Sequence, residues 1–439
     1  MSRSTEPQWR RDSPFEVERV VPLRDATRRV TVALAKLGLT PVLRDMGPGG
    51  DPTAWSCRLL ADENAGPLPT EERAGPPMAE GMGKGRREAA RTGALFEALE
   101  HYLTGPALFD PTSLELVEPA HIVAGPLRRE ACGVLLARAP RSRLACHRYR
   151  PLGGGREIPV PLFLRAPWFV ETHAGRLREQ AGDTCDYGHL MRYSCNSGSA
   201  VGVTAAEALL HALNETIERD ALSLLLVRAF LSEADFHPNV IDPATLPYDL
   251  AHAYSAAERL TGSPVHLLDI TSDLGVPTML AYTIPTSRHP HRRGAGASLS
   301  ASYAAWRALT ELVQMTLGET LARSGAPLRD EPVWHADHPE LRACERFDLT
   351  DHLRGARTIP YGHPGGVPGH PREQLRELIS ILVAHGHVPY RRVVAVLPER
   401  IVAVHVIVPG LERFMLIIDG NLVLPGPRGR ALVRRYHAG

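Results

Sequence analysis

Apolar residues recur along four segments of the chain with the period of an amphipathic α-helix. These segments cover residues 25–37, 86–103, 205–226 and 301–322. The first segment stops at Gly38, a residue type that favours the position just after a helix end. The pattern therefore predicts four long helices.

Short apolar runs between and after these helices are typical of strands. Residues 264–271 and 276–284 predict buried strands, and residues 151–163 predict two strands joined by a glycine turn. The C-terminal part predicts three more strands, at 391–397, 402–408 and 414–419. The Pro- and Gly-rich stretches 61–80 and 360–371 predict loops. Helices and strands alternate without an internal repeat, so the expected fold class is α+β.

Composition places the chain among globular proteins with a large core. It has 439 residues, of which 44% are hydrophobic, enough for two or three packed lobes. The 50 Lys and Arg residues balance 49 Asp and Glu, so no global field would recruit nucleic acid or an anionic membrane. No run approaches the ~18 apolar residues of a membrane span, and the first residues lack the apolar segment of a secretory signal. We therefore expect a cytoplasmic protein.

Six cysteines are spread along the chain without a C-x-x-C pair. This spacing argues against a structural zinc site and against a disulfide framework. Ordinary reduced thiols are expected.

The predicted helix 205–226 concentrates acidic residues on one side. At the α-helical rotation per residue, four polar side chains share a stripe about 80° wide: Glu207, His211, Glu215 and Glu218. Arg219 lies beside this stripe, the opposite flank is apolar, and no Lys neutralises the carboxylates. The stripe is either a solvated outer face or the lining of a cation site.

A second helix favours the cation site. Glu97 and Glu100 lie one turn apart on the predicted helix 86–103. Carboxylates on two helices suit Mg²⁺, which keeps waters and takes its other ligands from substrate phosphates. Lys84, Arg219 and Arg307 could neutralise a triphosphate. The residues therefore predict a magnesium–nucleotide site.

No standard nucleotide motif accounts for this site. Around the GMGKGR segment, Met78 stands where a P-loop needs its first glycine, and Gly85 where it needs Ser or Thr. A P-loop is excluded. A Rossmann turn is not expected either, because no strand-like run immediately precedes the glycines. The loop 196–202 could bring backbone N–H groups to a phosphate, or could be a plain linker.

Three segments together resemble the signatures of the YcaO family. They are GKGRREAARTGALFEALEHY (83–102), NSGSAVGVTAAEALLHALNETIERDA (196–221) and SLSASYAAWRALTELVQ (298–314). Residues 269–281 and 405–412 fit the strands that flank the third signature. The resemblance implies a YcaO-type fold around a carboxylate-rich ATP/Mg²⁺ site. It also implies an N-terminal helix/strand region and linker (1–80), a catalytic domain (81–412) and a C-terminal strand and tail (413–439).

The resemblance carries the family's site over residue by residue. The expected Mg²⁺ ligands are Glu97, Glu100, Glu207, Glu215 and Glu218, and the expected catalytic residues are Glu215, Glu218, Arg219 and Arg307. The expected ATP contacts are Arg24, Thr31, Lys84, Glu97, Glu100, Glu207, Arg219 and Arg307, with Arg24 and Thr31 resting on a loose match.

Two positions depart from the family pattern. Gly93 and His101 stand where the first signature usually has Ser and Arg. Both changes remove polar groups near the expected phosphates, which keeps a non-catalytic ATP-binding scaffold as an alternative.

The reaction implied by the resemblance is phosphorylation of a backbone amide oxygen in a ribosomally made peptide. Cyclodehydration of Cys, Ser or Thr to an azoline is the leading expectation, although the chain end lacks the family's proline-rich tail. Thioamidation with a TfuA-type partner and macroamidine formation remain open. A glycosidase is disfavoured because its two carboxyl groups must face each other across a cleft, whereas these acids share helix stripes.

The expected partners follow from the same resemblance. They are a precursor peptide and a leader-binding protein of the E1-like/ThiF-like or TfuA type, with a flavin dehydrogenase and a homodimer left open. Neither nucleic acid nor a membrane is expected.

Overall fold

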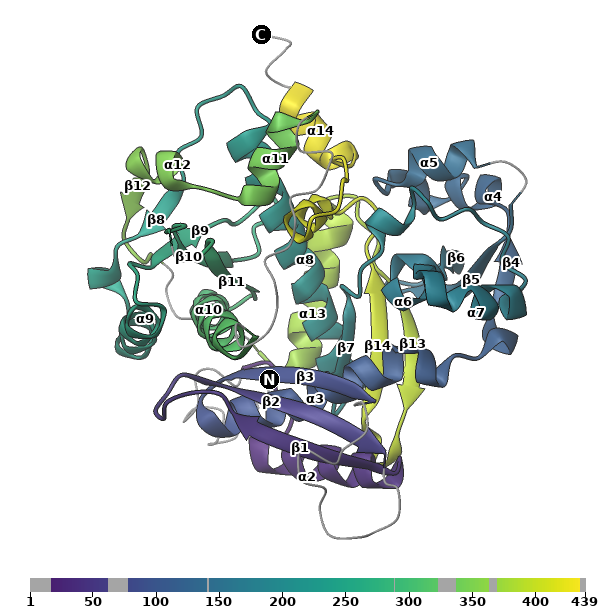
Figure 1. Cartoon of the computed structure of the whole chain (residues 1–439), viewed down its shortest axis with the longest axis horizontal. Helices are drawn as coiled ribbons and strands as arrows, with labels where there is room; N and C mark the ends of the chain where they lie inside the picture. The colour runs from purple at the N-terminus through teal and green to yellow at the C-terminus, as the bar shows by residue number, and fades with distance from the viewer. Residues whose placement is uncertain are drawn as a thin grey trace, which may run out of the picture.

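The computed structural model describes residues 17–61, 78–139, 142–287, 289–322, 337–362 and 369–434. Its elements form three sheets around the long helix α8 (Ala205–Phe230) (Figure 1). No helix among the described residues is long and apolar enough to cross a membrane.

The first sheet lies near the N-terminus and has the order β1-β2-β3. Its antiparallel strands are β1 (Leu39–Asp45), β2 (Thr53–Ala61) and β3 (Ala79–Gly85). Helix α3 (Arg87–Thr104) packs across β2 and β3, and α2 (Leu23–Lys36) packs beside α3 on β1. Their apolar faces share one hydrophobic cluster with this sheet.

Glycines let α3 lie directly on β3. A Cβ atom at Gly83 would come within 1.8 Å of the Ala90 carbonyl oxygen, and one at Gly81 within 2.2 Å of the Ala98 nitrogen. The GMGKG segment is therefore itself a strand. The expectation that no strand-like run precedes these glycines missed that they lie in β3 themselves, because three glycines and a lysine carry no apolar alternation that would mark a strand.

The second sheet has the order β11-β10-β9-β8-β12. Its strands are β8 (Asn239–Ile241), β9 (His266–Asp269), β10 (Thr278–Thr283), β11 (Arg292–Ala297) and β12 (Arg357–Ile359). Only the β12–β8 pair among these neighbours is parallel. Helix α10 (Ala301–Ala322) packs on β10 and β11, and α9 (Tyr248–Thr261) packs beside α10.

The third sheet has the order β4-β5-β13-β14-β7, and β6 pairs with β5. Its strands are β4 (Glu115–Val117), β5 (Leu144–Pro151), β6 (Ile158–Pro161), β7 (Ser199–Gly202), β13 (Tyr390–Val396) and β14 (Val402–Ile407). Helix α8 packs against this sheet and α13 (Pro371–Ala384) packs against α8, within one hydrophobic cluster. Short helices α4 (Pro119–Val123), α5 (Gly133–Arg138), α6 (Pro167–Val170) and α7 (Gly175–Ala181) surround β4–β6.

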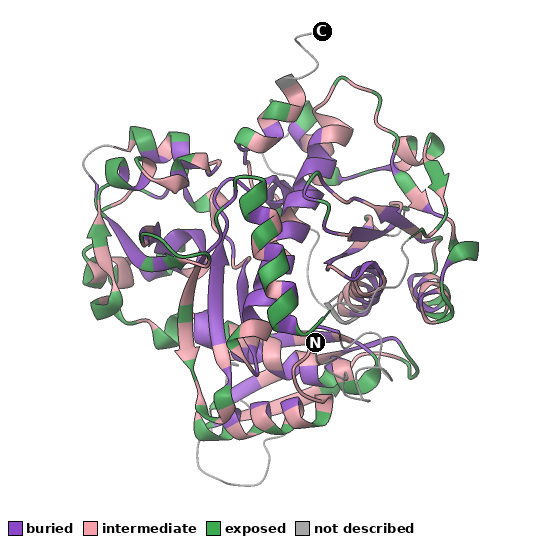
Figure 2. Ribbon diagram, turned by 180° about the vertical axis from the view of Figure 1, so that it is seen from behind, coloured by how far each residue is buried: buried purple, intermediate pink, exposed green. Residues whose placement is uncertain are grey.

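Most residues of helix α8 are buried. The Thr204 side chain caps its N-terminus by accepting a hydrogen bond from the Glu207 N–H at 3.2 Å. Its apolar residues enter two hydrophobic clusters, so sheets pack around it on several sides (Figure 2). This packing fixes which of its polar residues can face a cavity.

The remaining elements complete the side of the molecule near the C-terminus. They are helices α11 (Pro339–Arg346), α12 (Thr350–Arg354) and α14 (Pro427–Arg434) and the 3₁₀ helix η10 (Phe414–Asp419). Residues of η10 belong to the hydrophobic cluster around the C-terminal half of α8.

The four predicted helices are confirmed within a few residues at each end, as α2, α3, α8 and α10. Most predicted strands are also confirmed, as β6, β9, β10, β13 and β14, whereas the first strand predicted in 151–163 overlaps β5 only at Pro151. The strand predicted at 414–419 was wrong, because this segment is η10. Loop residues 62–77 and 363–368 lie outside the described residues, and the domain boundaries after residues 80 and 412 remain predictions.

Candidate nucleotide and metal site

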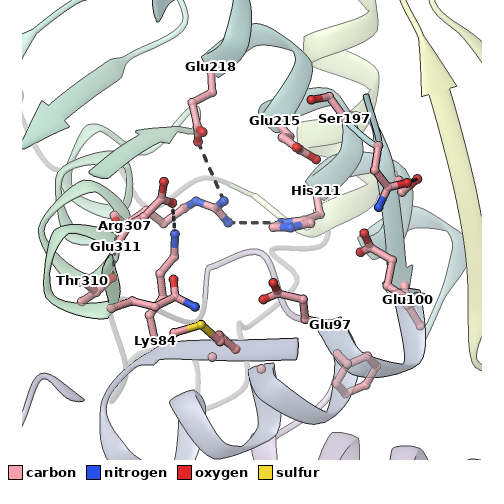
Figure 3. A pocket seen from close by; sticks show the side chains of 18 of the residues that line it. Lys84, Glu97, Glu100, Ser197, His211, Glu215, Glu218, Arg307, Thr310 and Glu311 are labelled. Carbon is pink, nitrogen blue, oxygen red and sulfur yellow. Dashed lines mark hydrogen bonds and ion pairs between the residues drawn. The ribbon is translucent and has the colours of Figure 1, made fainter. Parts of the chain in front are cut away.

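A cavity of about 830 Å³ lies between helices α3, α8 and α10. Its wall also includes residues of β3, β7, η10 and α2, of the loops on either side of β7, and of the segment before α2. Figure 3 shows acidic and basic side chains from these elements pointing into one space. The two acidic helix stripes predicted from the sequence therefore face the same cavity.

Glu100 lacks a nearby positive charge among the described residues of this cavity. Burial, followed by the charges of Glu215 and Glu97, raises the pKa of Glu100 well above its usual value. Burial also raises the pKa of Glu97, partly offset by His101 and Lys84. Like charges in a poorly solvated site disfavour ionisation. A cation between α3 and α8 would relieve this repulsion.

Lys84, on β3, forms an ion pair with Glu311 on α10. Burial alone would raise the pKa of Glu311, but Lys84 and then Arg219 outweigh it and hold that pKa at about 2. This pair joins the first sheet to α10 across the cavity (Figure 3).

Arg307, also on α10, contacts α8 through two groups. Its Nη1 lies 3.1 Å from Nδ1 of His211, and its Nη2 lies 3.9 Å from Oε2 of Glu218. Glu218 is 3% exposed, and its Oε2 has no hydrogen-bond partner among the described residues. A buried carboxylate oxygen without a donor suits a bound cation or a reorganised arginine.

Arg219 projects from α8 next to the same acids. Its Nη2 lies 3.7 Å from Oε1 of Glu215. Burial lowers the pKa of Arg219, but Glu215 and Glu218 outweigh burial, so the net direction is upward. The Gly198 N–H, in the loop before α8, donates to Glu215 Oε2 at 3.3 Å.

Glu207 lies at the start of α8, where the segment before α2 meets the cavity. The Val20 N–H donates to its Oε1, and the Val203 N–H donates to its Oε2 at 3.1 Å. Next to Val20, the Glu18 carboxylate accepts from Asn214 at 2.8 Å. The polypeptide before α2 thus forms part of the cavity wall.

The charges of the lining match a magnesium–triphosphate group. Nine carboxylates face the cavity, against four Lys and Arg side chains. Magnesium ions would lie against the acids, while phosphates would lie against Lys84, Arg219 and Arg307. Bound Mg²⁺ would give a ligand to the Glu218 oxygen, which has no hydrogen-bond partner in the described part of the chain, and a nearby cation to Glu100, which lacks one there.

The residues do not already form a closed metal cage. Within the described ranges, no three His, Cys, Asp or Glu side chains lie close enough to hold a metal ion together. The five predicted carboxylate ligands share the cavity, while their coordination of Mg²⁺ stays a prediction.

Most predicted site residues line the cavity, but two do not. Lys84, Glu97, Glu100, Glu207, Glu215, Glu218, Arg219 and Arg307 are all in its wall. Arg24 and Thr31 are exposed on α2 and are absent from that wall. Thr31 instead donates to the Thr27 carbonyl oxygen of its own helix at 2.9 Å.

The two positions that depart from the family pattern also line the cavity. A Cβ atom at Gly93 would lie 3.3 Å from the Gly83 Cα, so little room exists for a larger residue. His101 Nδ1 lies 2.5 Å from the Glu80 carbonyl oxygen, which anchors the ring to β3.

Sequence reasoning missed Glu311, Glu18 and Arg19, which all line the cavity. Glu311 follows Arg307 by one helical turn, so it lies on the same helix face as this predicted ATP contact. That spacing was a signal from which Glu311 could have been predicted. Glu18 and Arg19 precede the first helix and carry no periodic signal.

The sequence model of one protein family, described as YcaO cyclodehydratase, ATP- and Mg²⁺-binding, matches residues 82–412. The chain belongs to the YcaO family. This confirms the resemblance and the expected cofactors, ATP and Mg²⁺.

Two curated relatives are similar over part of the chain. An uncharacterized protein from the tfuA 3′ region of Rhizobium leguminosarum bv. trifolii is 28% identical over 54% of this chain. An uncharacterized protein of Methanothermobacter thermautotrophicus is 31% identical over 35% of it. The matches span 57% and 39% of the relatives' own lengths.

Solved structures show the same fold. The YcaO protein of Methanopyrus kandleri bound with AMPPCP and Mg²⁺ is 18% identical, with a TM-score of 0.59 over 92% of this chain and 95% of that one. A heterocyclase in complex with substrate and cofactor is 17% identical, with a TM-score of 0.59 over 91% of this chain and 54% of that one. These likenesses confirm the α+β, YcaO-type fold.

Proposed function

We propose that this YcaO protein uses ATP and Mg²⁺ to phosphorylate backbone amide oxygens of a ribosomally made peptide. The leading reaction is cyclodehydration of Cys, Ser or Thr, and its product is a thiazoline or oxazoline. The observation that carries the proposal is the cavity in which carboxylates of α3 and α8, including Glu100 with no cation near it in the described ranges, face cationic side chains of β3, α8 and α10.

The acidic wall provides the metal-binding half of the proposed site. Glu97, Glu100 and Glu215 would hold Mg²⁺ from two helices, and Glu207 and Glu218 would extend this set along α8. When bound, Mg²⁺–ATP supplies the phosphoryl group and the charge that these acids lack. Bound Mg²⁺ would favour the ionised form of Glu100, because it would offset the like charges that raise the pKa of this group.

The basic residues provide the phosphate-binding half. Arg219 and Arg307 lie beside Glu215 and Glu218, so each guanidinium is held in place before a phosphate arrives. Positioned cations lower the barrier to phosphoryl transfer mainly through orientation and electrostatics. Lys84 would divide its three donors between Glu311 and a phosphate oxygen.

The peptide's own side chain would select the product. A neighbouring thiol or hydroxyl adds to the amide carbon, the resulting oxyanion takes the γ-phosphoryl group, and inorganic phosphate leaves with the former amide oxygen. The net change in the peptide is the loss of one water molecule at each ring.

Thioamidation is the second candidate. It is favoured by one specific observation, the similarity to a Rhizobium protein encoded beside tfuA. In that case an external sulfur nucleophile replaces the side chain, and the partner is of the TfuA type. The same cavity would activate the amide in both reactions.

Partners of similar proteins guide the expected assembly. The E. coli microcin synthetase McbBCD complex has a chain with a TM-score of 0.54 to this one at 11% identity. A related structure of that complex contains bound pro-MccB17. We therefore propose a precursor peptide and a separate leader-binding protein, with a flavin dehydrogenase required only if azolines are oxidised further.

The test is peptide-dependent ATP consumption with intact-mass analysis of the peptide. Candidate precursors encoded beside the gene are incubated with the protein, ATP and Mg²⁺, with and without the partner. Loss of water indicates azolines, exchange of oxygen for sulfur indicates a thioamide, and an unchanged peptide without ATP consumption indicates a scaffold. Glu215→Gln should abolish turnover, whereas Glu88→Gln, an exposed change on α3, should not.

A further inference from the structure

The turn of α8 that carries Glu218 and Arg219 also carries Asp220. Glu218 and Arg219 line the cavity, whereas Asp220 is not in its wall and is completely buried. Consecutive helix residues differ by about 100° in direction, so one turn can serve two sites. Asp220 faces the C-terminal part of the chain.

Asp220 is held by three donors from that part. Arg428, on α14, donates from Nε to Oδ1 at 2.8 Å and from Nη2 to Oδ2 at 3.1 Å. The Glu412 N–H donates to Oδ1 at 2.8 Å. A bidentate guanidinium fixes the plane of a carboxylate as well as its position.

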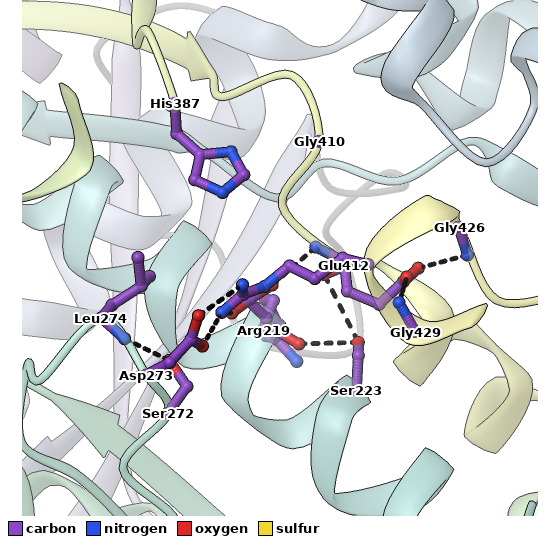
Figure 4. A network of polar contacts seen from close by, with 12 residues as sticks. Arg219, Ser223, Ser272, Asp273, Leu274, His387, Gly410, Glu412, Gly426 and Gly429 are labelled. Atoms are coloured by element: carbon purple, nitrogen blue, oxygen red, sulfur yellow. Dashed lines mark hydrogen bonds and ion pairs between the residues drawn. The ribbon is translucent and has the colours of Figure 1, made fainter. Parts of the chain in front are cut away.

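Glu412 ties the start of α14 to the same place. The Gly426 and Gly429 N–H groups each donate to its carboxylate at 2.9 Å (Figure 4). A Cβ atom at Gly429 would come within 2.9 Å of Glu412 Oε2, so these close contacts require glycine. The chain from 412 to 429 is therefore folded back onto α8.

This folded segment supplies one wall of the cavity. The Met415 N–H donates to Ser223 Oγ at 2.9 Å, and Ser223 Oγ donates to the Arg219 carbonyl oxygen at 2.7 Å. Met415, Leu416 and Asp419, all in η10, line the cavity. The backbone of Arg219 and this wall are thus joined by one hydroxyl group.

Arg428 is the cation that balances Asp220. Among the described groups acting on Asp220, it is the one positive charge, and Asp273 adds a negative one. Asp273 contacts the same guanidinium at 3.0 Å, but its side chain is 58% exposed and it lies outside α8. It therefore offers a matched control for Asp220.

We propose that Asp220 and Arg428 are positioning residues that fix Arg219 and the η10 wall in the arrangement needed for phosphoryl transfer. This inference rests on the proposed function and names two residues that act through Arg219 without lining the cavity. We call the Asp220–Arg428 ion pair, with its contact to Glu412, the clamp. The clamp lies on the side of α8 away from the cavity, behind Glu218 and Arg219. It therefore affects the transition state more than the binding of nucleotide.

The experiment compares Asp220→Asn, Arg428→Gln and Arg428→Lys with Asp273→Asn in the full-length protein. Asp220→Asn and Arg428→Gln should lower kcat for peptide-dependent ATP consumption about tenfold or more, and should weaken binding of Mg²⁺–AMPPCP by a smaller factor. Arg428→Lys should recover part of kcat, and Asp273→Asn should match the wild type. A folded Asp220→Asn protein with unchanged kcat would overturn the proposal.

Hydrogen exchange separates this inference from the proposed function. In Asp220→Asn, backbone amides in 215–223 and 412–430 should lose protection together, while Asp273→Asn should leave both protected. Independent behaviour of the two segments would refute the clamp even if the enzyme proves inactive on every peptide tried. Absence of turnover in the wild type, with coupled exchange intact, would instead count against the proposed reaction alone.

Discussion

Arg307 Nη1 lies 3.1 Å from Nδ1 of His211, on the helix that also carries Glu207, Glu215 and Glu218 of the cavity wall. An arginine can only donate, so His211 accepts at Nδ1 and carries its proton on Nε2. Burial, and then the charge of Arg307, lowers the pKa of His211 to about 3. His211 is therefore a neutral acceptor that orients a cation.

This relationship predicts an acid sensitivity that His211→Gln should reduce. Between the usual histidine pKa of 6.5 and about 3, the unfolded chain binds a proton that the folded chain does not. The stability of the wild type should thus fall as pH drops, by about 2 kcal/mol from this residue between pH 7.5 and 5. Urea unfolding of both proteins at the two pH values measures the difference, and equal losses would contradict a neutral buried His211.

The crowded acids predict that removing one charge stabilises the protein without its cofactors. Glu100→Gln should raise the melting temperature of the metal-free protein by about 2 °C, because an uncompensated charge is removed. It should also abolish the further rise that Mg²⁺ and AMPPCP give the wild type. Differential scanning fluorimetry tests both effects. The exposed change Glu88→Gln should keep the ligand-induced rise, and a destabilised Glu100→Gln protein would contradict the assignment.

The ion pair between Lys84 and Glu311 predicts non-additive effects. Lys84→Met leaves a mostly buried carboxylate without its first counter-charge and should cost about 2 kcal/mol of unfolding free energy. The double variant Lys84→Met with Glu311→Gln should recover most of this loss. Denaturant unfolding of the single and double variants gives the coupling energy. Additive effects would show that the two groups do not interact.

The close packing of α3 on β3 predicts that Gly83→Ala is severely destabilising. The new Cβ atom would lie 1.8 Å from a backbone oxygen of α3, so helix and strand must separate, with an expected loss of about 3 kcal/mol or more. Gly153→Ala is the matched control, because a Cβ atom there meets nothing within 4 Å. Thermal unfolding of both variants should show a large loss only for the first.

Helical periodicity was enough to predict much of the site. Glu207, Glu215 and Glu218 share one stripe of α8 for reasons of helix geometry alone, and the structure places that stripe in the cavity. The same holds for Glu97 and Glu100 on α3. Which helices would face one another depended on the resemblance to the YcaO family.

Tertiary contacts were beyond sequence reasoning in three places. Glu18 reaches Asn214 across nearly half of the chain, and no local pattern encodes such a contact. The run at 414–419 is apolar and buried as a strand would be, yet short buried runs do not reveal their backbone geometry. The glycines of β3 match no nucleotide-binding motif, and the structure explains them by the close approach of the α3 backbone.

Acids of α3 and α8 and cations of β3, α8 and α10 should together bind one magnesium–triphosphate group. Isothermal titration calorimetry with AMPPCP, in Mg²⁺ and in EDTA, tests it most directly on the wild type, Glu97→Gln and Glu215→Gln. Binding should require Mg²⁺ in the wild type and fall at least about tenfold in both variants. Nucleotide binding that is equally tight in EDTA, or unchanged in both variants, would contradict the account.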